Sequence, residues 1–180
     1  MGTERRRLLM ILLSSCLAGF NVRYDGGNAR RPLAFKLLAV GAAITVCPEI
    51  MAGFDTPREP AEIQGGTGAD VLAGRARVVT KSGADVTANY LMAARQVLAI
   101  AQKHQVTVAY LKQKSPACGS KVIYDGNFAG QRIAGQGVTA ALLQQHGIRV
   151  FGDEELTKEH VAPFLSPAVV KLLDKHNLVE

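Results

Sequence analysis

Short apolar runs separated by helical segments are the feature that most constrains the fold of this chain. Residues 8–15 form a continuous apolar run that ends in small residues, which is typical of a strand buried on both faces. Further short strands are predicted at residues 42–46, 77–80, 106–111 and 148–151. Because strands that alternate with helices form parallel sheets, we predict an α/β fold with a Rossmann-like open parallel sheet.

Helices are predicted between these strands and after the last one. Residues 32–40 begin with a proline, which suits a first helical turn, and residues 85–104 begin with Asp-Val-Thr and carry one apolar face. Residues 137–146 are closed by Gly147, and residues 166–177 begin with a capping serine followed by proline. We therefore expect helices on both faces of the sheet, with the ligand site at the carboxyl edge of the strands.

The length and composition are those of one ordinary domain. The chain has 180 residues, of which 48% are hydrophobic and 20% charged, enough to bury a core. A formal net charge of +6 gives a mild preference for anionic partners, but the basic residues are dispersed, so we do not expect a nucleic acid polymer as partner. No stretch approaches the about 18 apolar residues of a membrane span. Residues 50–74 are rich in glycine, proline and charge without periodicity, which indicates a functional or a disordered segment.

The N-terminus permits two interpretations. Arg5-Arg6-Arg7, a short apolar run and Leu13-Ser14-Ser15-Cys16 together resemble a bacterial lipoprotein signal, in which Cys16 would carry the lipid. The alternative is the buried first strand of a cytoplasmic protein. We favour the strand and a cytoplasmic location, because the other two cysteines occupy matching positions and a signal peptide gives no reason for that match.

Each of the three cysteines follows one of the predicted strands. Cys16 comes after the first strand, Cys47 after the second, and Cys118 shortly after the strand at 106–111. Glycine, serine or proline flanks each of them, which leaves room for a bulky ligand. Because the carboxyl ends of parallel strands share one edge, we expect the thiols to converge there. Three thiolates suit a soft metal or an iron–sulfur cluster.

Other interpretations of the cysteines are open at this point. A lone cysteine is most often a small buried hydrophobe. A structural zinc ion usually has four ligands, often in Cys-x-x-Cys pairs, and the sequence contains no such pair. All four histidines lie near the ends of predicted helices, where contacts with the helix dipole or with solvent are favoured over metal ligation: His104, His146, His160 and His176.

Seven motifs occur in an order that a known family shares: Ser-Ser-Cys-Leu-Ala-Gly at 14–19, Arg-Tyr-Asp-Gly at 23–26, Val-Cys-Pro-Glu at 46–49, Pro-Arg-Glu-Pro-Ala-Glu-Ile at 57–63, Ser-Pro-Ala-Cys-Gly at 115–119, Tyr-Asp-Gly at 124–126 and Gly-Val-Thr-Ala-Ala at 137–141. As a set they resemble the TudS-type thiouracil desulfidase family, long catalogued as a domain of unknown function. Relatives often carry serine at the position of Ala117, and some have an additional cysteine near Val22. Neither departure touches the three cysteines.

The resemblance implies a 4Fe–4S cluster held by only three thiolates, those of Cys16, Cys47 and Cys118, with one iron left open. It implies a non-redox reaction in which water replaces sulfur on thiouracil or on a thiouracil nucleotide such as 4-thio-UMP, with sulfide as the second product. The family pattern assigns an acid/base role to Glu49. It also assigns positioning of the substrate or water to Ser115.

Further residues are expected to bind the substrate. Tyr24-Asp25 and Tyr124-Asp125 each follow a cysteine loop, and both loops should border the pocket, although turn formation alone explains an Asp-Gly pair. Arg23, Arg58 and Lys112 would hold a phosphate if the substrate is a nucleotide. The alternative is that these three side chains are ordinary solvated surface charges without a binding role.

Two further expectations concern domain organisation and function. We predict a desulfidase domain over residues 1–152 and a C-terminal helical extension over residues 153–180 that packs on the same domain. The alternative function is a non-catalytic iron–sulfur module for electron transfer or sensing. Ligation of the cluster by a fourth protein group would favour that alternative.

Overall fold

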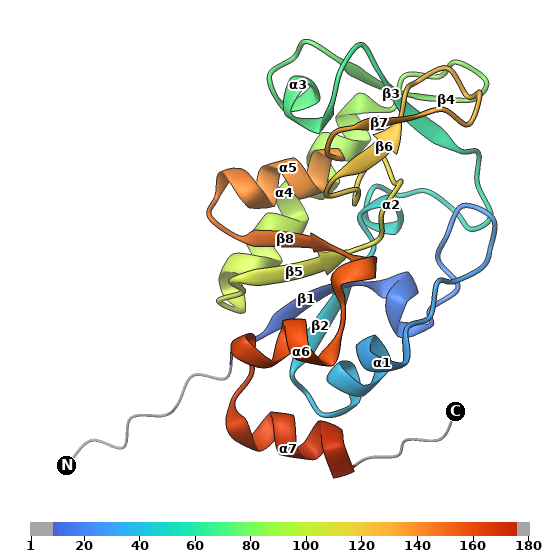
Figure 1. The fold of residues 1–180 in the computed structure, drawn as a ribbon. Helices are drawn as coiled ribbons and strands as arrows, with labels where there is room; N and C mark the ends of the chain where they lie inside the picture. The colour runs from blue at the N-terminus through green and yellow to red at the C-terminus, as the bar shows by residue number, and fades with distance from the viewer. Residues whose placement is uncertain (1–8, 176–180) are drawn as a thin grey trace.

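A four-stranded parallel sheet forms the centre of the computed structural model, which describes residues 9–175 (Figure 1). Its strands, in the order β2-β1-β5-β8, are β2 (Ala43–Val46), β1 (Ile11–Ser14), β5 (Val108–Leu111) and β8 (Arg149–Gly152). Each neighbouring pair is parallel. All four coincide with predicted strands, so the predicted parallel α/β fold is confirmed.

Two helices cover one face of the sheet. Alternate side chains of a strand point to opposite faces. Those of Leu12 in β1 and Ala109 in β5 join a buried apolar cluster with α4 (Thr87–Lys103) and α5 (Val138–Gln145). Both helices were predicted, α4 from its N-terminal cap and apolar face and α5 from the glycine that closes it, and packing of their apolar faces stabilises them.

The opposite face is covered by α1 (Pro32–Ala39) and by the C-terminal segment. Leu13 and Tyr110, the residues that directly follow Leu12 and Ala109, pack on this face with Leu37 of α1. The C-terminal segment comprises η2 (Asp153–Glu155), α6 (Lys158–Val161), η3 (Ala162–Phe164) and α7 (Pro167–Lys175). The Tyr110 hydroxyl and His160 Nδ1 lie 2.7 Å apart, which ties α6 to the sheet. Helices therefore lie on both faces, as predicted.

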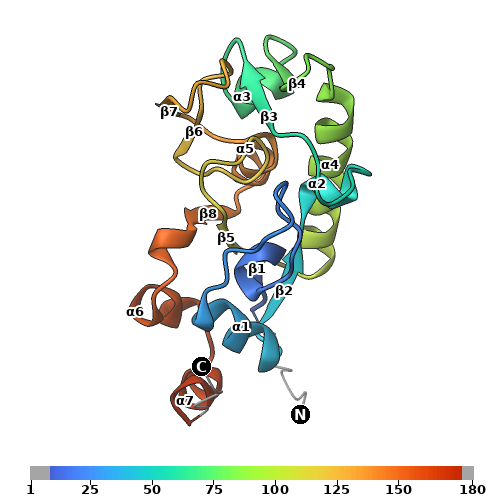
Figure 2. The same cartoon turned by 90° about the vertical axis from the view of Figure 1, so that its right-hand side faces the viewer.

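Two short antiparallel hairpins and a small helix lie beyond the parallel sheet. The hairpins pair β3 (Ala61–Gln64) with β4 (Arg77–Thr80), and β6 (Val122–Tyr124) with β7 (Arg132–Ala134). In both views they lie with α3 (Gly68–Leu72) at the end of the molecule opposite α1 and α7 (Figure 1 and Figure 2). β4 was predicted as a strand, but it pairs antiparallel with β3 and is not part of the parallel sheet. This pairing could not be predicted, because β3 lies in a segment where no strand pattern is visible in the sequence.

The aperiodic segment 50–74 is ordered. It contains the end of α2 (Pro48–Met51), then β3 and α3, and Thr67 and Asp70 form a capping box at the start of α3. The chain ends fall outside the described residues, which include neither Arg5 to Leu8 of the signal-like start nor His176 and Asn177 at the predicted helix end. Within residues 9–175, no helix has the length and apolar character needed to cross a membrane.

Candidate functional site

A cavity of about 500 Å³ opens at the carboxyl edge of the parallel sheet, between the strand ends and the two hairpins. The chain segments that leave β1, β2 and β5 supply one side of it, and β3, β6 and the β6–β7 turn supply the other. All three cysteines line this cavity: Cys16, Cys47 and Cys118. The topology therefore brings together three side chains that are far apart in sequence, as expected for parallel strands.

Local backbone structure fixes each cysteine. Cys16 lies in η1 (Ser15–Ala18), the turn that directly follows β1, and its carbonyl accepts a hydrogen bond from Ala29 N at 3.0 Å. Cys47 is the residue before α2, so the first turn of that helix begins beside its thiol. The Cys118 amide donates to Ser115 Oγ at 3.1 Å, which closes a turn between β5 and the cysteine.

The N-terminus of α5 holds the loop that carries Cys118. Val138 N donates to the Pro116 carbonyl at 2.8 Å, and Thr139 N donates to the Ala117 carbonyl at 3.0 Å. A Cβ at Gly137 would lie 2.5 Å from the Ala117 carbonyl carbon, so only glycine permits this approach. Amide groups that a helix leaves unpaired at its N-terminus thus hold the third thiol in place.

Burial raises the pKa of all three thiols. The pKa of Cys16 is raised to about 11 by burial and by the nearby Cys47, against the opposing effect of Lys112 and Arg23. Burial also raises the pKa of Cys47, and it raises that of Cys118 well above the ordinary value, with a further contribution from the other two cysteines. The three sulfurs are close enough to influence one another, and none of them forms a disulfide. A bound cation at this position would favour the thiolate forms.

The donor set fits an iron–sulfur cluster better than a single ion. Among residues 9–175, no three His, Cys, Asp or Glu side chains come close enough to hold one metal ion. In a 4Fe–4S cluster each cysteine binds a different iron, so the sulfurs are spread around the cluster rather than gathered on one ion. Three free thiols from three loops around one cavity meet that requirement.

Glu49 lines the cavity in the first turn of α2 and is held at both oxygens. Oε1 accepts a hydrogen bond from the Tyr90 hydroxyl at 2.7 Å, and Oε2 lies 2.5 Å from Arg58 Nη2. Burial, followed by the proximity of Glu49, raises the pKa of Tyr90 well above its ordinary value. The hydroxyl therefore remains a hydrogen-bond donor to Glu49.

Arg58 occupies a different place from the one expected for a phosphate ligand. Its side chain is only 8% exposed and is not among the cavity-lining residues. Besides Glu49 it donates to the Val22 carbonyl at 2.9 Å and to Thr56 Oγ1 at 3.2 Å. These contacts make Arg58 a positioning partner of Glu49 rather than a group free to bind phosphate.

Of the other expected site residues, Arg23, Tyr24, Lys112 and Ser115 line the cavity. Asp25 does not: its Oδ1 accepts from Gly27 N at 3.0 Å, as in an ordinary turn, and its Oδ2 lies 3.5 Å from Arg23.

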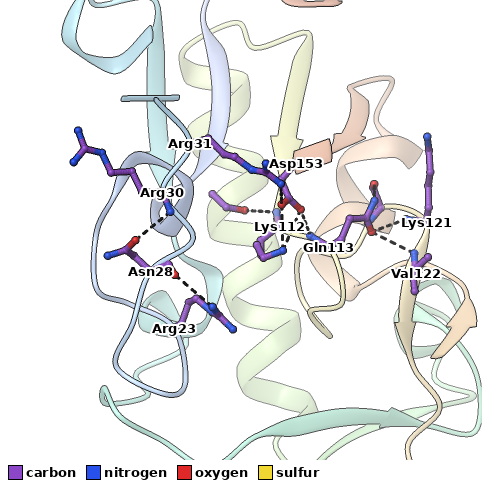
Figure 3. Close-up of polar contacts among 11 residues, drawn as sticks. Arg23, Asn28, Arg30, Arg31, Lys112, Gln113, Lys121, Val122 and Asp153 are labelled. Carbon is purple, nitrogen blue, oxygen red and sulfur yellow. Dashed lines mark hydrogen bonds and ion pairs between the residues drawn. The ribbon is translucent and has the colours of Figure 1, made fainter. Parts of the chain in front are cut away.

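Lys112 is held by a buried carboxylate that the sequence did not reveal. Figure 3 shows Lys112, Gln113 and Arg31 converging on Asp153. Lys112 Nζ lies 3.2 Å from both carboxylate oxygens, while Gln113 N donates to Oδ1 at 2.8 Å and Arg31 to Oδ2 at 3.0 Å. Burial of Asp153 opposes its ionisation, but these donors outweigh burial and hold the pKa of the carboxyl below its ordinary value.

Sequence reasoning missed the cavity residues that the hairpins contribute. These are Pro60, Ala61, Glu62, Lys81, Phe128 and Gly130, whereas Tyr124 lines the cavity as expected from the second Tyr-Asp-Gly motif. Glu62 belongs to the Pro-Arg-Glu-Pro-Ala-Glu-Ile motif, and that membership was the one available signal for it. Pro60 and Ala61 belong to the same motif, Lys81 directly follows the strand predicted at 77–80, and Phe128 and Gly130 lie in a segment without a recognisable strand or helix pattern.

A family model described as 2-thiouracil desulfurase matches residues 11–155. The chain belongs to this family. It is 52% identical over 147 residues to the uncharacterized protein YbbK of Bacillus subtilis strain 168. This alignment covers 82% of the chain and 97% of YbbK. It is also similar to the solved structure of a 4Fe–4S-dependent thiouracil desulfidase, TudS, with a TM-score of 0.76 and 41% identity over 86% of this chain and 97% of that one.

Membership in the 2-thiouracil desulfurase family confirms the resemblance read from the motifs and identifies the chain as an enzyme. The matched region contains all three cysteines, Glu49 and the buried Asp153, and it ends within η2. Helices α6 and α7 lie beyond it.

Proposed function

We propose that this chain removes sulfur from thiouracil, or from a thiouracil nucleotide, at a 4Fe–4S cluster held by Cys16, Cys47 and Cys118. The observation that carries the proposal is the meeting of three free thiols and an oriented glutamate in one cavity. The 2-thiouracil desulfurase family and the structural likeness to a 4Fe–4S-dependent desulfidase support it. When bound, a cluster with three protein ligands supplies an open iron, a Lewis acid able to polarise a thiocarbonyl group.

The overall reaction balances without an oxidant or reductant. The oxygen of water forms the new bond to the ring carbon, the carbon–sulfur bond breaks, and sulfur leaves as sulfide with the protons that water brought. The carbon keeps its oxidation state. The protein therefore has to orient the ring, admit one water molecule and move protons.

Glu49 is the group proposed to move these protons. Tyr90 and Arg58 fix its carboxylate at both oxygens, and their bonds still leave lone pairs on the oxygens that can accept a proton from the attacking water. Ser115 Oγ accepts two backbone amides, from Ala117 and Cys118, so its own hydrogen remains available to donate to water or substrate. Ser115 thus combines a turn-forming role with the proposed positioning role.

The charge of the cavity favours a nucleotide such as 4-thio-UMP over a free base. Four cationic side chains line it: Arg23, Lys81, Lys112 and Lys114. Lys112 is paired with Asp153, whereas Lys81 and Lys114 form no salt bridge with any residue in the range 9–175. Unpaired cations beside a site for an uncharged ring fit a phosphate on the same ligand.

Anaerobic reconstitution followed by a sulfide assay tests the proposal. The loaded protein should release sulfide from 2-thiouracil, 4-thiouracil or 4-thio-UMP without any added reductant. In water enriched in oxygen-18, the uracil product should carry the label. Cluster-loaded protein that releases no sulfide from any of the three, or a product without the label, would contradict the hydrolytic reaction.

A further inference from the structure

Glu62 is a second buried acidic residue in the cavity, and the proposed reaction leaves it without a role. It lies in β3, is 8% exposed and lines the cavity from the side opposite the strand ends. No cationic side chain among residues 9–175 forms a salt bridge with it. A buried acidic group without a counter-ion requires other hydrogen-bond donors.

The two oxygens of Glu62 have different surroundings. Oε2 accepts hydrogen bonds from Gly126 N at 2.9 Å and from Phe128 N at 3.1 Å. Within the described part of the chain, no residue donates a hydrogen bond to Oε1. One oxygen is thus fixed by the protein and the other is left for a ligand in the cavity.

The tip of the β6–β7 hairpin is shaped to hold this carboxylate. Gly126 and Phe128 have φ values of +87° and +55°, the left-handed region, and Phe128 is not a glycine. This backbone geometry directs two amide groups at a single oxygen. A side-chain conformation maintained by strained backbone at a cavity wall points to a binding role.

A vacant carboxylate oxygen selects an N–H donor on its ligand. In 2-thiouracil and in 4-thiouracil alike, the N3–H group is bonded directly to the thiocarbonyl carbon, and in a nucleotide it is the remaining ring N–H because N1 carries the sugar. We propose that Glu62 Oε1 accepts the hydrogen of ring N3 and so selects uracil-type over cytosine-type rings. This inference rests on the proposed function for its substrate class. In a cytosine-type ring N3 is an acceptor, so two acceptors would face each other.

The Glu62→Gln variant tests the assignment with little change of shape. The glutamine carbonyl should keep the bonds to Gly126 N and Phe128 N, because an amide NH2 group offers no acceptor to them. The NH2 group then occupies the Oε1 position, which turns an acceptor into a donor. Glu59→Gln is a matched control from the same motif, since Glu59 is exposed and bonds to Ser82 rather than to the hairpin.

Calorimetric binding of the product-like ligands UMP, N3-methyl-UMP and CMP to the cluster-loaded protein gives the readout. The wild-type protein and Glu59→Gln should bind UMP on the order of 100-fold more tightly than the other two ligands. Glu62→Gln should lose this preference and bind CMP at least as tightly as UMP. A purely structural role for Glu62 would weaken all three ligands together.

The outcomes separate the two proposals. If sulfide is released but Glu62→Gln keeps the wild-type preference for UMP, the assignment of Glu62 is overturned and the proposed function stands. If no thiolated substrate releases sulfide while the preference for UMP depends on Glu62, the proposed function fails and the assignment of Glu62 stands. Equal binding of UMP and CMP by the wild-type protein would also overturn the assignment.

Discussion

The two sides of the cavity are built in opposite ways. On the sheet side, the cysteines lie in segments that follow buried parallel strands, and α5 and Asp153 hold the segment between β5 and Cys118. On the hairpin side, Glu62 and Lys81 stand on short antiparallel strands that meet the cavity at their ends. The sheet side has the thiols that a reactive cofactor needs, whereas the hairpin side has groups suited to reading a ligand. Changes on the first side should therefore remove chemistry, and changes on the second should alter preference.

The largest effect is expected for Cys47→Ala on the sheet side. A cluster that loses one of three protein ligands should not be retained, so sulfide release should fall to background. Iron content and the visible absorbance of the reconstituted protein measure the cluster. A melting temperature close to that of the wild-type apoprotein would show that the fold is preserved, and a fully loaded Cys47→Ala variant would refute the ligand assignment.

The next effect is expected for Glu49→Gln, which removes the proposed proton carrier but keeps its size. The kcat for sulfide release should fall by about 10²–10⁴-fold while iron content and KM change little. Steady-state kinetics on cluster-loaded protein measure this, with Glu59→Gln as the control. A Glu49→Gln variant with wild-type kcat would remove Glu49 from the mechanism and leave it a structural partner of Arg58 and Tyr90.

A smaller effect, on stability, is expected for Asp153→Asn. Neutralising this buried carboxylate leaves Lys112 and Arg31 without their counter-ion and should lower the free energy of unfolding by about 2 kcal/mol near neutral pH. Because the folded-state pKa of Asp153 is lowered, its stabilisation is present above about pH 4 and is lost as the pH falls through the folded-state value.

Denaturant unfolding of wild type and Asp153→Asn from pH 7 to pH 3 checks both parts of that prediction. The difference in stability between the two proteins should narrow below about pH 4. A difference that stays constant with pH would mean that the ionised form of Asp153 contributes nothing to stability. Asp174→Asn, an exposed partner of Lys158, serves as a control with little expected effect.

The smallest effect is expected for Lys81→Ala on the hairpin side. Loss of one exposed cation should raise the KM for 4-thio-UMP a few-fold, and the increase should shrink as salt is added. The KM for 4-thiouracil, which has no phosphate, should not change. Lys103→Ala, at the far end of α4, is the control, and an equal rise in KM for base and nucleotide would argue against a phosphate contact.

The same division explains how far the sequence could predict the structure. Strands β1 and β5 are apolar runs because both of their faces are buried, and the edge strands β2 and β8 are largely apolar as well. All four are therefore visible in the sequence, and the cysteines that follow β1, β2 and β5 could be placed with them. Strands β6 and β7 have three residues each, and β3 lies among glycines and prolines, so no periodic pattern could emerge.

The side chains that hold Glu49 and Lys112 could not be predicted from the sequence, for a related reason. Glu49 could be proposed from its motif, but its contact with Tyr90 depends on how α2 packs against α4, and its contact with Arg58 depends on the path of the loop between α2 and β3. Asp153 lies 41 positions from Lys112, and only the pairing of β5 with β8 makes them neighbours. Long-range contacts of this kind follow from tertiary packing and leave no local signal.

The bond from Gly137 N to the Gly119 carbonyl, 2.8 Å long, gives the β6–β7 excursion a closed base. Residues 120–136 leave the sheet side after Gly119 and return to it at Gly137, and the amides of Ser120, Lys121 and Val122 donate to Gln113 Oε1. The tip of the hairpin, residues 125–131, is the part that can vary without moving Cys118 or the start of α5. Exchanging this tip changes the two amides that hold Glu62 Oε2, and is then a direct way to alter base preference while the three cysteines stay in place.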